Sequence, residues 1–286
     1  MKHSLFTSLA LLLVFVLTSC EKPLLTGADS EQKPSGNLVV SVFQIEQTPF
    51  ERLTRTPAAE ACTRLNYAVY NTEGTRVKQV NQESGDEDFG TATFQLDEGN
   101  YHVVVVGHSS NGNPTMTNAA KIQFTNSQGF TDTFISSDNV TIAEEQVNLN
   151  VSINRIVALC RFVITDDYPA NVAKLRFRYT GGSGAFNATT GLGVVKSTQT
   201  VWFEDLSTNP KQFDLYTFLH DTTGTIHLTV SAYDASDNVL FEREFDVPME
   251  QNKITWFSGP YFTATSSSTF TVSVNTDWAG ELHINF

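Results

Sequence analysis

Residues 96–107, with the sequence LDEGNYHVVVVG, are the stretch from which the fold of this chain can be inferred. The four valines after Tyr101 and His102 are typical of a strand in the middle of a sheet, covered on both faces. Gly99 can adopt positive φ values and so allow a tight turn into this strand. Because turn residues followed by short β-branched or aromatic runs recur along the chain, the sequence predicts an all-β protein.

These strand-like runs fall into two consecutive sets, and no segment has a convincing 3.6-residue apolar period. The second set begins with RIVALCRFVI at residues 155–164, so we place a domain boundary between residues 153 and 154. Two tandem Greek-key β-sandwiches of about seven strands each, at residues 37–153 and 154–286, fit the spacing. A single large barrel is the alternative. The expected strands are 38–45, 65–70, 92–96, 101–107, 121–124, 130–135 and 147–153, then 155–164, 175–179, 193–202, 212–219, 225–233, 239–245, 254–257, 269–274 and 282–286.

The composition excludes some classes of protein. The chain has 286 residues, and its 40% apolar content is enough to form packed cores. Its 18 lysines and arginines against 31 aspartates and glutamates give a formal charge of −13. Because binding to a phosphate backbone needs clustered positive charge, we expect no nucleic-acid partner.

Residues that carry chemistry are scattered along the sequence. The six histidines and three cysteines have no spacing that would form a zinc site, and there is no nucleophile elbow, P-loop or dinucleotide-binding motif. The acidic loop at residues 85–90 lacks the spaced ligands of a calcium-binding loop. The sequence therefore predicts a protein that is not an enzyme and that needs no metal or cofactor.

The N-terminus has the features of a secretory signal, with an apolar run at residues 5–17 that is too short for a comfortable membrane span. The run ends in Leu17-Thr18-Ser19-Cys20, which resembles the bacterial lipobox. We therefore expect residues 1–19 to be removed, Cys20 to carry lipid and residues 20–36 to be a flexible tether. An ordinary signal peptide with a chance cysteine is the alternative.

Several single residues have predicted structural roles. Cys62 and Cys160 are expected to be two separate buried thiols, and Arg155 to form a salt bridge at the domain junction. Pro248 is expected to end a strand, and the glycine-rich run at residues 179–184 to form a flexible loop. For the three tryptophans, packing in a core or at a domain end is favoured over stacking on sugars. These tryptophans are Trp202, Trp256 and Trp278.

Several segments, taken in order, resemble those of one family. They are the lipobox, LDEGNY at 96–101, NRIVA at 154–158, VPMEQNKIT at 247–255 followed by Ser258-Gly259, and DWAGE at 277–281. This order is similar to that of the fimbrillin superfamily of Bacteroidota, and more closely to its FimB-like lipidated minor or anchor subunits. The resemblance implies a pair of transthyretin-like β-sandwiches, attachment to the outer membrane and a role in type V pili.

The resemblance also implies assembly by strand exchange, in which an Arg-specific protease removes a first strand and a neighbour's strand fills the groove. Either Arg52 or Arg55, after the first expected strand, is a candidate for cleavage, and a solvated loop is the alternative. The C-terminal segment Leu282-His283-Ile284-Asn285-Phe286 is either a donated strand or the last strand of its own sheet.

Together these observations predict a non-enzymatic outer-membrane lipoprotein that acts as a fimbrial anchor or minor subunit in cell-surface adhesion. Its expected partners are the outer membrane, through the N-terminal lipid, and other fimbrial subunits, through β-strand addition. The alternative is a surface lipoprotein that binds glycans for polysaccharide capture.

Overall fold

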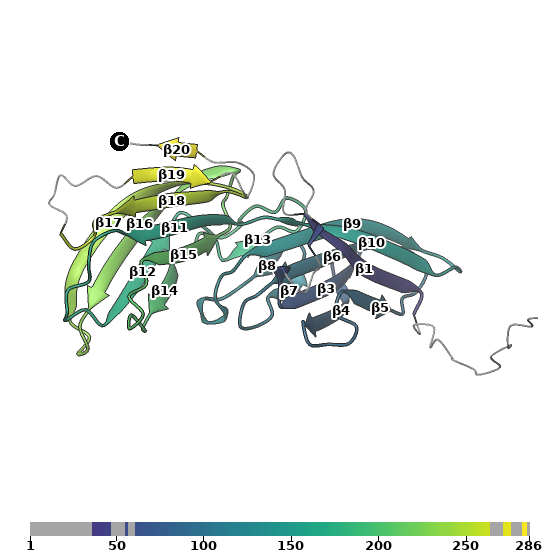
Figure 1. Ribbon diagram of the computed structural model, residues 1–286. Helices are drawn as coiled ribbons and strands as arrows, with labels where there is room; N and C mark the ends of the chain where they lie inside the picture. Colours follow the sequence, from purple (N-terminus) through teal and green to yellow (C-terminus); the bar gives the residue numbers. More distant parts are fainter. Residues whose placement is uncertain (1–35, 47–54, 57–60, 264–270, 276–281, 285–286) are drawn as a thin grey trace, which may run out of the picture. The chain divides into compact units, whose positions relative to one another are not determined.

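Strands and turns make up nearly all of the structure (Figure 1). The computed structural model describes residues 36–46, 55–56, 61–263, 271–275 and 282–284, and within them the prediction of an all-β protein is confirmed. These residues include one short 3-10 helix, η1 (Asn126–Gln128). No helix in the described part of the chain is long and apolar enough to cross a membrane.

The strands are numbered in chain order. The first half of the chain contains β1 (Leu38–Glu46), β2 (Arg55–Thr56), β3 (Arg64–Asn71), β4 (Arg76–Glu83), β5 (Thr91–Phe94), β6 (Gly99–His108), β7 (Thr115–Asn118), β8 (Lys121–Gln123), β9 (Thr133–Ile142) and β10 (Val147–Arg155). The second half contains β11 (Ala158–Ile164), β12 (Lys174–Thr180), β13 (Ala185–Phe186), β14 (Gln199–Phe203), β15 (Gln212–Thr217), β16 (Thr223–Tyr233), β17 (Val239–Glu250), β18 (Ile254–Gly259), β19 (Thr271–Asn275) and β20 (Leu282–Ile284).

The first half folds as two layers around one core. One layer has the strand order β9, β6, β3 and β4, and the other contains β10, β1 and β5, with β2 paired to the end of β1. The two layers are continuous at one corner, where Asn154 and Arg155 of β10 pair with Ile135 and Phe134 of β9. The valine strand β6 lies between β3 and β9, which is the central position that its sequence predicts.

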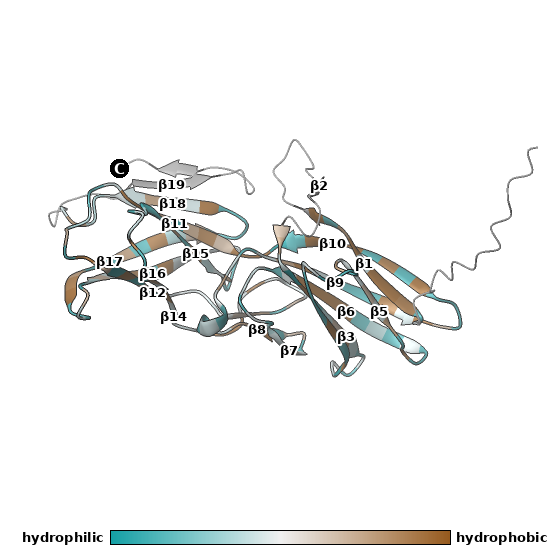
Figure 2. Cartoon of the chain, turned by 60° about the horizontal axis from the view of Figure 1, so that its bottom comes forward, coloured by the Kyte–Doolittle hydropathy of each residue, from teal (hydrophilic) through white to brown (hydrophobic). Residues whose placement is uncertain are grey.

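Alternation along the strands supplies the apolar core. In β6, Val103 and Val105 face the interior of this sandwich, while Val104 and Val106 are buried on the opposite face of the sheet. Bands of apolar and polar residues alternate along strands such as β10 (Figure 2). This pattern is typical of strands that bury one face, whereas β6 is apolar throughout its centre because both of its faces are covered.

The second half is a sandwich of two sheets, β15-β11-β18-β19-β20 and β14-β12-β16-β17. Side chains from both sheets meet in one core cluster around Phe162. The Phe162 ring centroid lies 5.4 Å from that of Phe177 and 5.8 Å from that of Phe257. Cys160 is buried in this core and Cys62 in the core of the first half, so the prediction of two separate buried thiols is confirmed.

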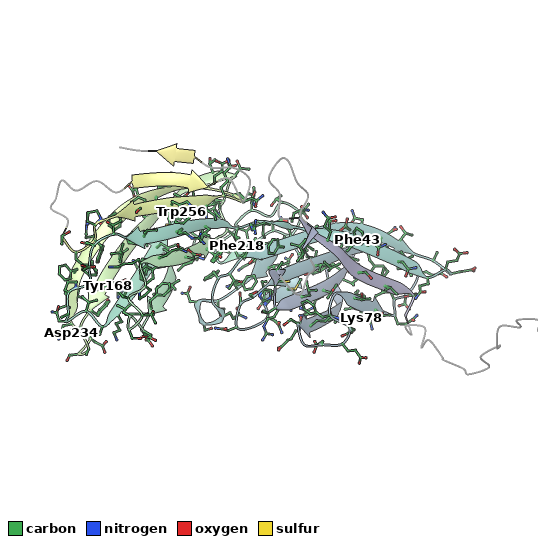
Figure 3. The ribbon with its side chains drawn as sticks, viewed as in Figure 1. Phe43, Lys78, Tyr168, Phe218, Asp234 and Trp256 are labelled. Carbon is green, nitrogen blue, oxygen red and sulfur yellow. The ribbon has the colours of Figure 1, made fainter. Side chains whose placement is uncertain are left out.

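A third apolar cluster contains residues of both halves. It includes Val104 and Val106 of β6 together with Phe186 of β13 and Phe218, which is labelled in Figure 3. Backbone pairing also crosses between the halves, because Ile122 of β8 pairs with Phe186. Residues 34–286 form one compact unit, and the predicted boundary between residues 153 and 154 stays a prediction.

Arg155 forms the predicted salt bridge where the two halves meet. Its guanidinium donates two hydrogen bonds of 2.7 Å to the carboxylate of Asp132 and a third, of 3.4 Å, to Oδ1 of Asn252. Its Cζ lies 4.9 Å from the centre of the Phe134 ring. Arg155 is the last residue of β10, however, so the prediction that one strand covers residues 155–164 is wrong at its start: β11 begins only at Ala158.

Two further predictions about the second half are wrong. Pro248 does not end β17, which continues to Glu250, because an edge strand tolerates a residue without an N–H. The glycine-rich run is packed rather than flexible, since Ser183 is fully buried and bonded to the backbone of Phe218. A Cβ at Gly182 would lie 1.9 Å from Oγ1 of Thr217, so this position needs glycine for close packing.

Candidate functional site

The residues predicted to attach and assemble the protein lie at the two ends of the chain. Cys20, Arg52, Asn285 and Phe286 fall outside the described residues, so lipidation of Cys20 and cleavage at Arg52 stay predictions. Arg55 is described through its backbone as part of β2. The remaining predicted residues, Leu282, His283 and Ile284, form β20.

Strand β1 is hydrogen-bonded on both of its edges. It runs parallel to β10, with Leu38 beside Val147 at one end and Glu46 beside Asn154 at the other. On its other edge, residues 38–41 pair antiparallel with β5, and the last two residues pair with β2. Removing β1 would therefore leave unpaired edges on β10 and on β5.

The side chains of β1 are part of the first core. Leu38, Val40 and Ile45 are fully buried, and each such burial contributes about 1.5–3 kcal/mol. The register of β1 on β10 shifts at a bulge between Val42 and Gln44, and Phe43 at this bulge is 65% exposed (Figure 3). The strand thus fills a slot in the sandwich instead of lying on its surface.

The residue before β1 is also fixed by hydrogen bonds. The side chain of Asn37 donates to the carbonyl oxygen of Leu96 at 2.7 Å and accepts from the Leu96 N–H at 2.9 Å. Gln146 donates to the carbonyl oxygen of Gly36 at 2.9 Å. The chain that leads from the predicted tether is therefore held as soon as it reaches the sandwich.

The structure brings Arg55 next to the end of β1, because its backbone pairs with Glu46. A break in the chain on either side of β2 would leave the pairing of β1 with β10 and β5 intact. Cleavage at Arg55 would therefore release β1 only if a competing strand displaced it.

The C-terminal strand has a different environment. β18 pairs with β19 over five residues, and β19 pairs in turn with β20 through Val272, Ser273 and Val274. Within the described strands β20 pairs only with β19, at the end of the sheet. β1 and β20 belong to different sheets, so the structure does not bring the two predicted assembly segments together.

Asp166 fastens the chain where it leaves β18. Its carboxylate accepts hydrogen bonds from the backbone N–H groups of Tyr261, Phe262 and Thr263 and from the Thr263 hydroxyl, at 2.6–2.9 Å. Burial tends to raise the pKa of Asp166, but these hydrogen bonds outweigh it and lower the pKa below its ordinary value. The ionised carboxylate thus holds the start of the segment that leads to β19 and β20.

The described tryptophans lie at the surface of the second sandwich. Trp202 on β14 is 43% exposed, so of the two predicted environments, a core or a domain end, the core does not apply to this residue. β14 is the edge of its sheet, and the Trp202 ring lies against Tyr233 with Arg176 5.6 Å from its centre. Trp256, labelled in Figure 3, is half-buried with Arg161 4.9 Å from its ring, and Trp278 lies outside the described residues.

The described histidines do not gather. His108 is fully buried: its Nε2 lies 2.7 Å from Oδ1 of Asn66, and its Nδ1 accepts the N–H of Ser110. Burial lowers the pKa of His108 to about 4, with Arg64 adding to the shift. Among the residues that the structure describes, no group of three His, Cys, Asp or Glu side chains is placed to hold a metal ion.

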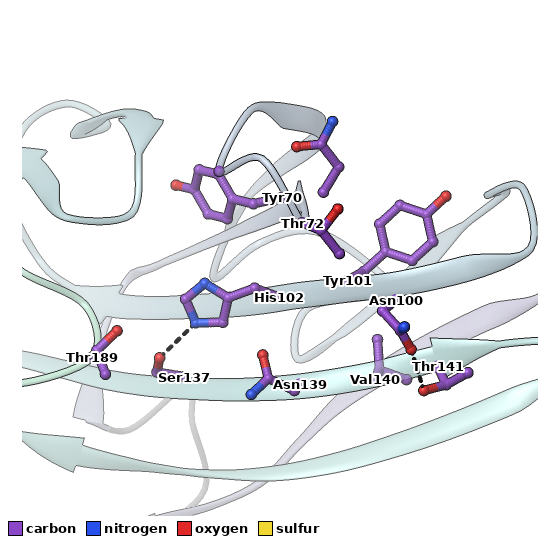
Figure 4. Close-up of a pocket in the computed structure, with 12 residues that line it drawn as sticks. Tyr70, Thr72, Asn100, Tyr101, His102, Ser137, Asn139, Val140, Thr141 and Thr189 are labelled. Atoms are coloured by element: carbon purple, nitrogen blue, oxygen red, sulfur yellow. Dashed lines mark hydrogen bonds between the residues drawn. The ribbon is translucent and has the colours of Figure 1, made fainter.

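A polar pocket that the sequence did not predict lies on the outer face of the first sandwich (Figure 4). It has a volume of about 600 Å³ and lies over β3, β6 and β9. A sequence signal was present in β9, where Ser137, Asn139 and Thr141 alternate with residues of the other face. Period-two alternation places these three polar side chains on one face of the sheet.

The described residues define a class of fold: an all-β protein with sandwich packing, in which the first described strand is embedded and the last described strand lies at a sheet edge. The model of a family of unknown function (DUF6562) matches residues 35–285, and the chain belongs to this family. No curated protein matches the chain.

Solved structures share the fold at low sequence identity. A Bacteroides thetaiotaomicron protein, provisionally described as polysaccharide-binding, is 11% identical with a TM-score of 0.53, covering 87% of this chain and 98% of that one. The fimbrial anchor protein Mfa2 of Porphyromonas gingivalis is 11% identical with a TM-score of 0.48, covering 87% and 99%. A provisional adhesin of Bacteroides ovatus is 15% identical with a TM-score of 0.49, covering 73% and 82%.

Proposed function

We propose that the protein is a non-enzymatic lipoprotein of the outer membrane that serves as an anchor or minor subunit of type V fimbriae in cell-surface adhesion. The observation that carries the proposal is the contrast between the two chain ends. Among the described strands, the first is paired on both edges within its sandwich, and the last lies at a sheet edge.

An anchor has to transmit force from the membrane to the fimbria. The lipobox at Cys20 supports attachment to the membrane, and the tether of residues 20–36 leads directly into β1. Pairing with β10 and β5, together with the bonds of Asn37, would carry a pull on the tether into the sandwich as a shear along β1. In this proposal β1 stays in place even if the chain is cut at Arg52 or Arg55.

The contact with the next subunit then falls to the C-terminal end. An edge strand presents unpaired N–H and C=O groups to which a further strand can add. β20 is such a strand within the described residues, and a short terminal hairpin is also a segment that could be donated to a neighbour. Both routes require the residues from Leu282 to the C-terminus.

The test uses bacteria that carry fimbriae. Deletion of residues 282–286 should release fimbriae into the medium while the protein stays in the outer-membrane fraction. Replacement Cys20→Ala should release the protein together with the fimbriae and abolish labelling by a fatty-acid probe. The double replacement of Arg52 and Arg55 by Ala should leave anchoring unchanged, since β1 is held by strand pairing.

Two outcomes would contradict the proposal. Persistence of the fatty-acid label in the Cys20→Ala variant would exclude the predicted lipidation site. Unchanged fimbriae in a strain lacking the whole protein, combined with loss of growth on one polysaccharide, would favour glycan capture.

A further inference from the structure

The pocket over β3, β6 and β9 is built from a row of side chains that cross three strands. Tyr70 of β3 pairs with His102 of β6, and His102 pairs on its other side with Asn139 of β9. The Tyr70 and His102 ring centroids are 5.9 Å apart. Figure 4 shows these side chains with Asn100 and Thr141, which form the next row along the sheet.

The same face of the sheet changes character along its length. On one side of His102, Val104 and Val106 of β6 and Ile135 of β9 are buried in the third apolar cluster. On the other side, Asn100, Asn139 and Thr141 are exposed. The pocket is therefore the place where a covered apolar face becomes an open polar one, and His102 lies at the border, half-buried.

Neutral hydrogen-bonding groups line this pocket. Nε2 of His102 lies 2.8 Å from Oγ of Ser137, and Oγ1 of Thr141 donates to Oδ1 of Asn100 at 2.7 Å. The side-chain amide of Asn139 has no hydrogen-bonding partner within the described part of the chain, although it lies on the pocket floor. An amide in this position offers two donors and an acceptor to a ligand.

Charge is missing from the lining, although the whole chain carries −13. None of the residues that line the pocket is an Asp, Glu, Lys or Arg. Burial lowers the pKa of His102, and the charge of Asp138 opposes this shift without reversing it, so the imidazole is neutral at pH 7. Such a surface offers no countercharge to an anionic or cationic ligand.

The walls come from turns on both sides of the floor. Thr72 and Gly74, in the turn between β3 and β4, line one side, and Thr189 contributes from the second half of the chain. The volume of about 600 Å³ falls within the range of about 300–1,000 Å³ that is usual for small-molecule sites. The pocket is thus concave, rich in amide and hydroxyl groups and uncharged.

We propose that this pocket binds a neutral saccharide, with the amides of Asn139 and Asn100 and the hydroxyl of Thr141 bonding sugar hydroxyls beside the ring of His102. Amides and hydroxyls match the paired donors and acceptors of sugar hydroxyls. The inference extends the proposed adhesion role by naming a class of ligand. It does not depend on that role, because saccharide binding is measured on the purified protein without fimbriae.

The experiment uses full-length protein purified from membranes in detergent. Affinity electrophoresis is run through gels that contain mannan, dextran or galactan as neutral probes and polygalacturonate as an acidic one. We expect at least one neutral polysaccharide to retard the protein, with no retardation by polygalacturonate. Asn139→Ala should raise the dissociation constant for that polysaccharide about tenfold, and Thr141→Val should also raise it.

The matched control is Asn150→Ala. Asn150 is also an exposed strand asparagine without a side-chain hydrogen bond in the described residues, but it lies on β10, away from the pocket lining. Its replacement should leave binding unchanged. Trp202→Ala tests the exposed tryptophan as a competing site and should also leave binding unchanged.

The proposal is overturned if none of the three neutral polysaccharides retards the protein, or if polygalacturonate binds better than all of them. It is equally overturned if binding survives Asn139→Ala and Thr141→Val but is lost in Trp202→Ala. Because none of these measurements involves fimbriae, a failure here leaves the anchor proposal to its own test.

Discussion

β1 and β20, the first and last of the described strands, differ in how much of the surrounding fold depends on each. β1 is paired with β10 on one edge and with β5 and β2 on the other, and it places three fully buried side chains in a core. β20 pairs through three residues with β19. A β-strand therefore lies between two paired neighbours at one end of the described chain, and at the edge of the described sheet at the other.

The largest expected effect comes from breaking β1. Val40→Asp would place a carboxylate without a partner in the first core, and we expect it to lower the free energy of unfolding by about 5 kcal/mol or to prevent folding. Chemical denaturation measures this loss. The control Ser41→Asp, at the neighbouring half-buried position outside the core cluster, should cost much less; equal midpoints for Val40→Asp and the unchanged protein would contradict the role assigned to β1.

The two bidentate Arg–Asp pairs allow a second comparison. The side chain of Arg155, which pairs with Asp132, is 4% exposed. The side chain of Arg161, which pairs with Asp214, is 21% exposed. We expect Arg155→Ala to cost about 3 kcal/mol, because a partly buried Asp132 is left without its partner, and Arg161→Ala to cost about 1 kcal/mol. Urea unfolding of both variants measures the two losses of unfolding free energy and shows which is larger. A larger loss for Arg161→Ala would show that the junction is not the more sensitive site.

The free energy of unfolding should depend on pH through His108, which is buried in the first half of the chain. His108 has an ordinary pKa near 6.5 when unfolded but about 4 when folded, so between these values the unfolded chain binds a proton that the folded chain excludes. The stability contributed by neutral His108 is complete above pH 6.5 and is lost as the pH falls toward 4, by about 3 kcal/mol at most.

Denaturant unfolding between pH 4 and pH 7 measures this effect. The variant His108→Gln keeps a polar side chain and removes the titration, so its stability should fall less over the same range. If the unfolding free energies of the unchanged protein and of His108→Gln fell in parallel between pH 7 and pH 4, the loss of stability would come from groups other than His108.

The smallest effect should come from the C-terminal strand. Removal of residues 282–286 takes away three edge pairs, and we expect it to lower the free energy of unfolding by less than about 1 kcal/mol. Thermal unfolding provides the measurement, with Asp166→Asn as a companion variant that loosens the start of the same segment. A loss as large as that of Val40→Asp would show that β20 is part of the fold and not an accessible edge.

Much of the strand pattern could be predicted because it depends on local alternation. Runs such as β3, β6 and β12 combine β-branched or aromatic residues with turn signals at their ends. β4 was missed, because it is an edge strand with a largely solvent-facing sequence, RVKQVNQE, and its charged residues, such as Lys78 in Figure 3, obscure the alternation.

The candidate site was less predictable. Arg155 could be assigned to a salt bridge from its position beside an apolar run, but its partner Asp132 lies 23 residues earlier. The polar pocket could not be predicted from any one segment, because Tyr70, His102 and Asn139 come from three strands. Its recognisable signal was the alternation in β9, which shows a polar face but not what surrounds it.

The sequence alone determined the class of fold and the two buried thiols, because each depends on local pattern, whereas lipid attachment at Cys20 stays a prediction from a short motif. Only the tertiary structure decided that β1 lies parallel to β10, more than a hundred residues away, and that Gly182 packs against Thr217. Both are contacts between distant segments, whose register is set by which side chains fit together in the core, and no local pattern contains that information.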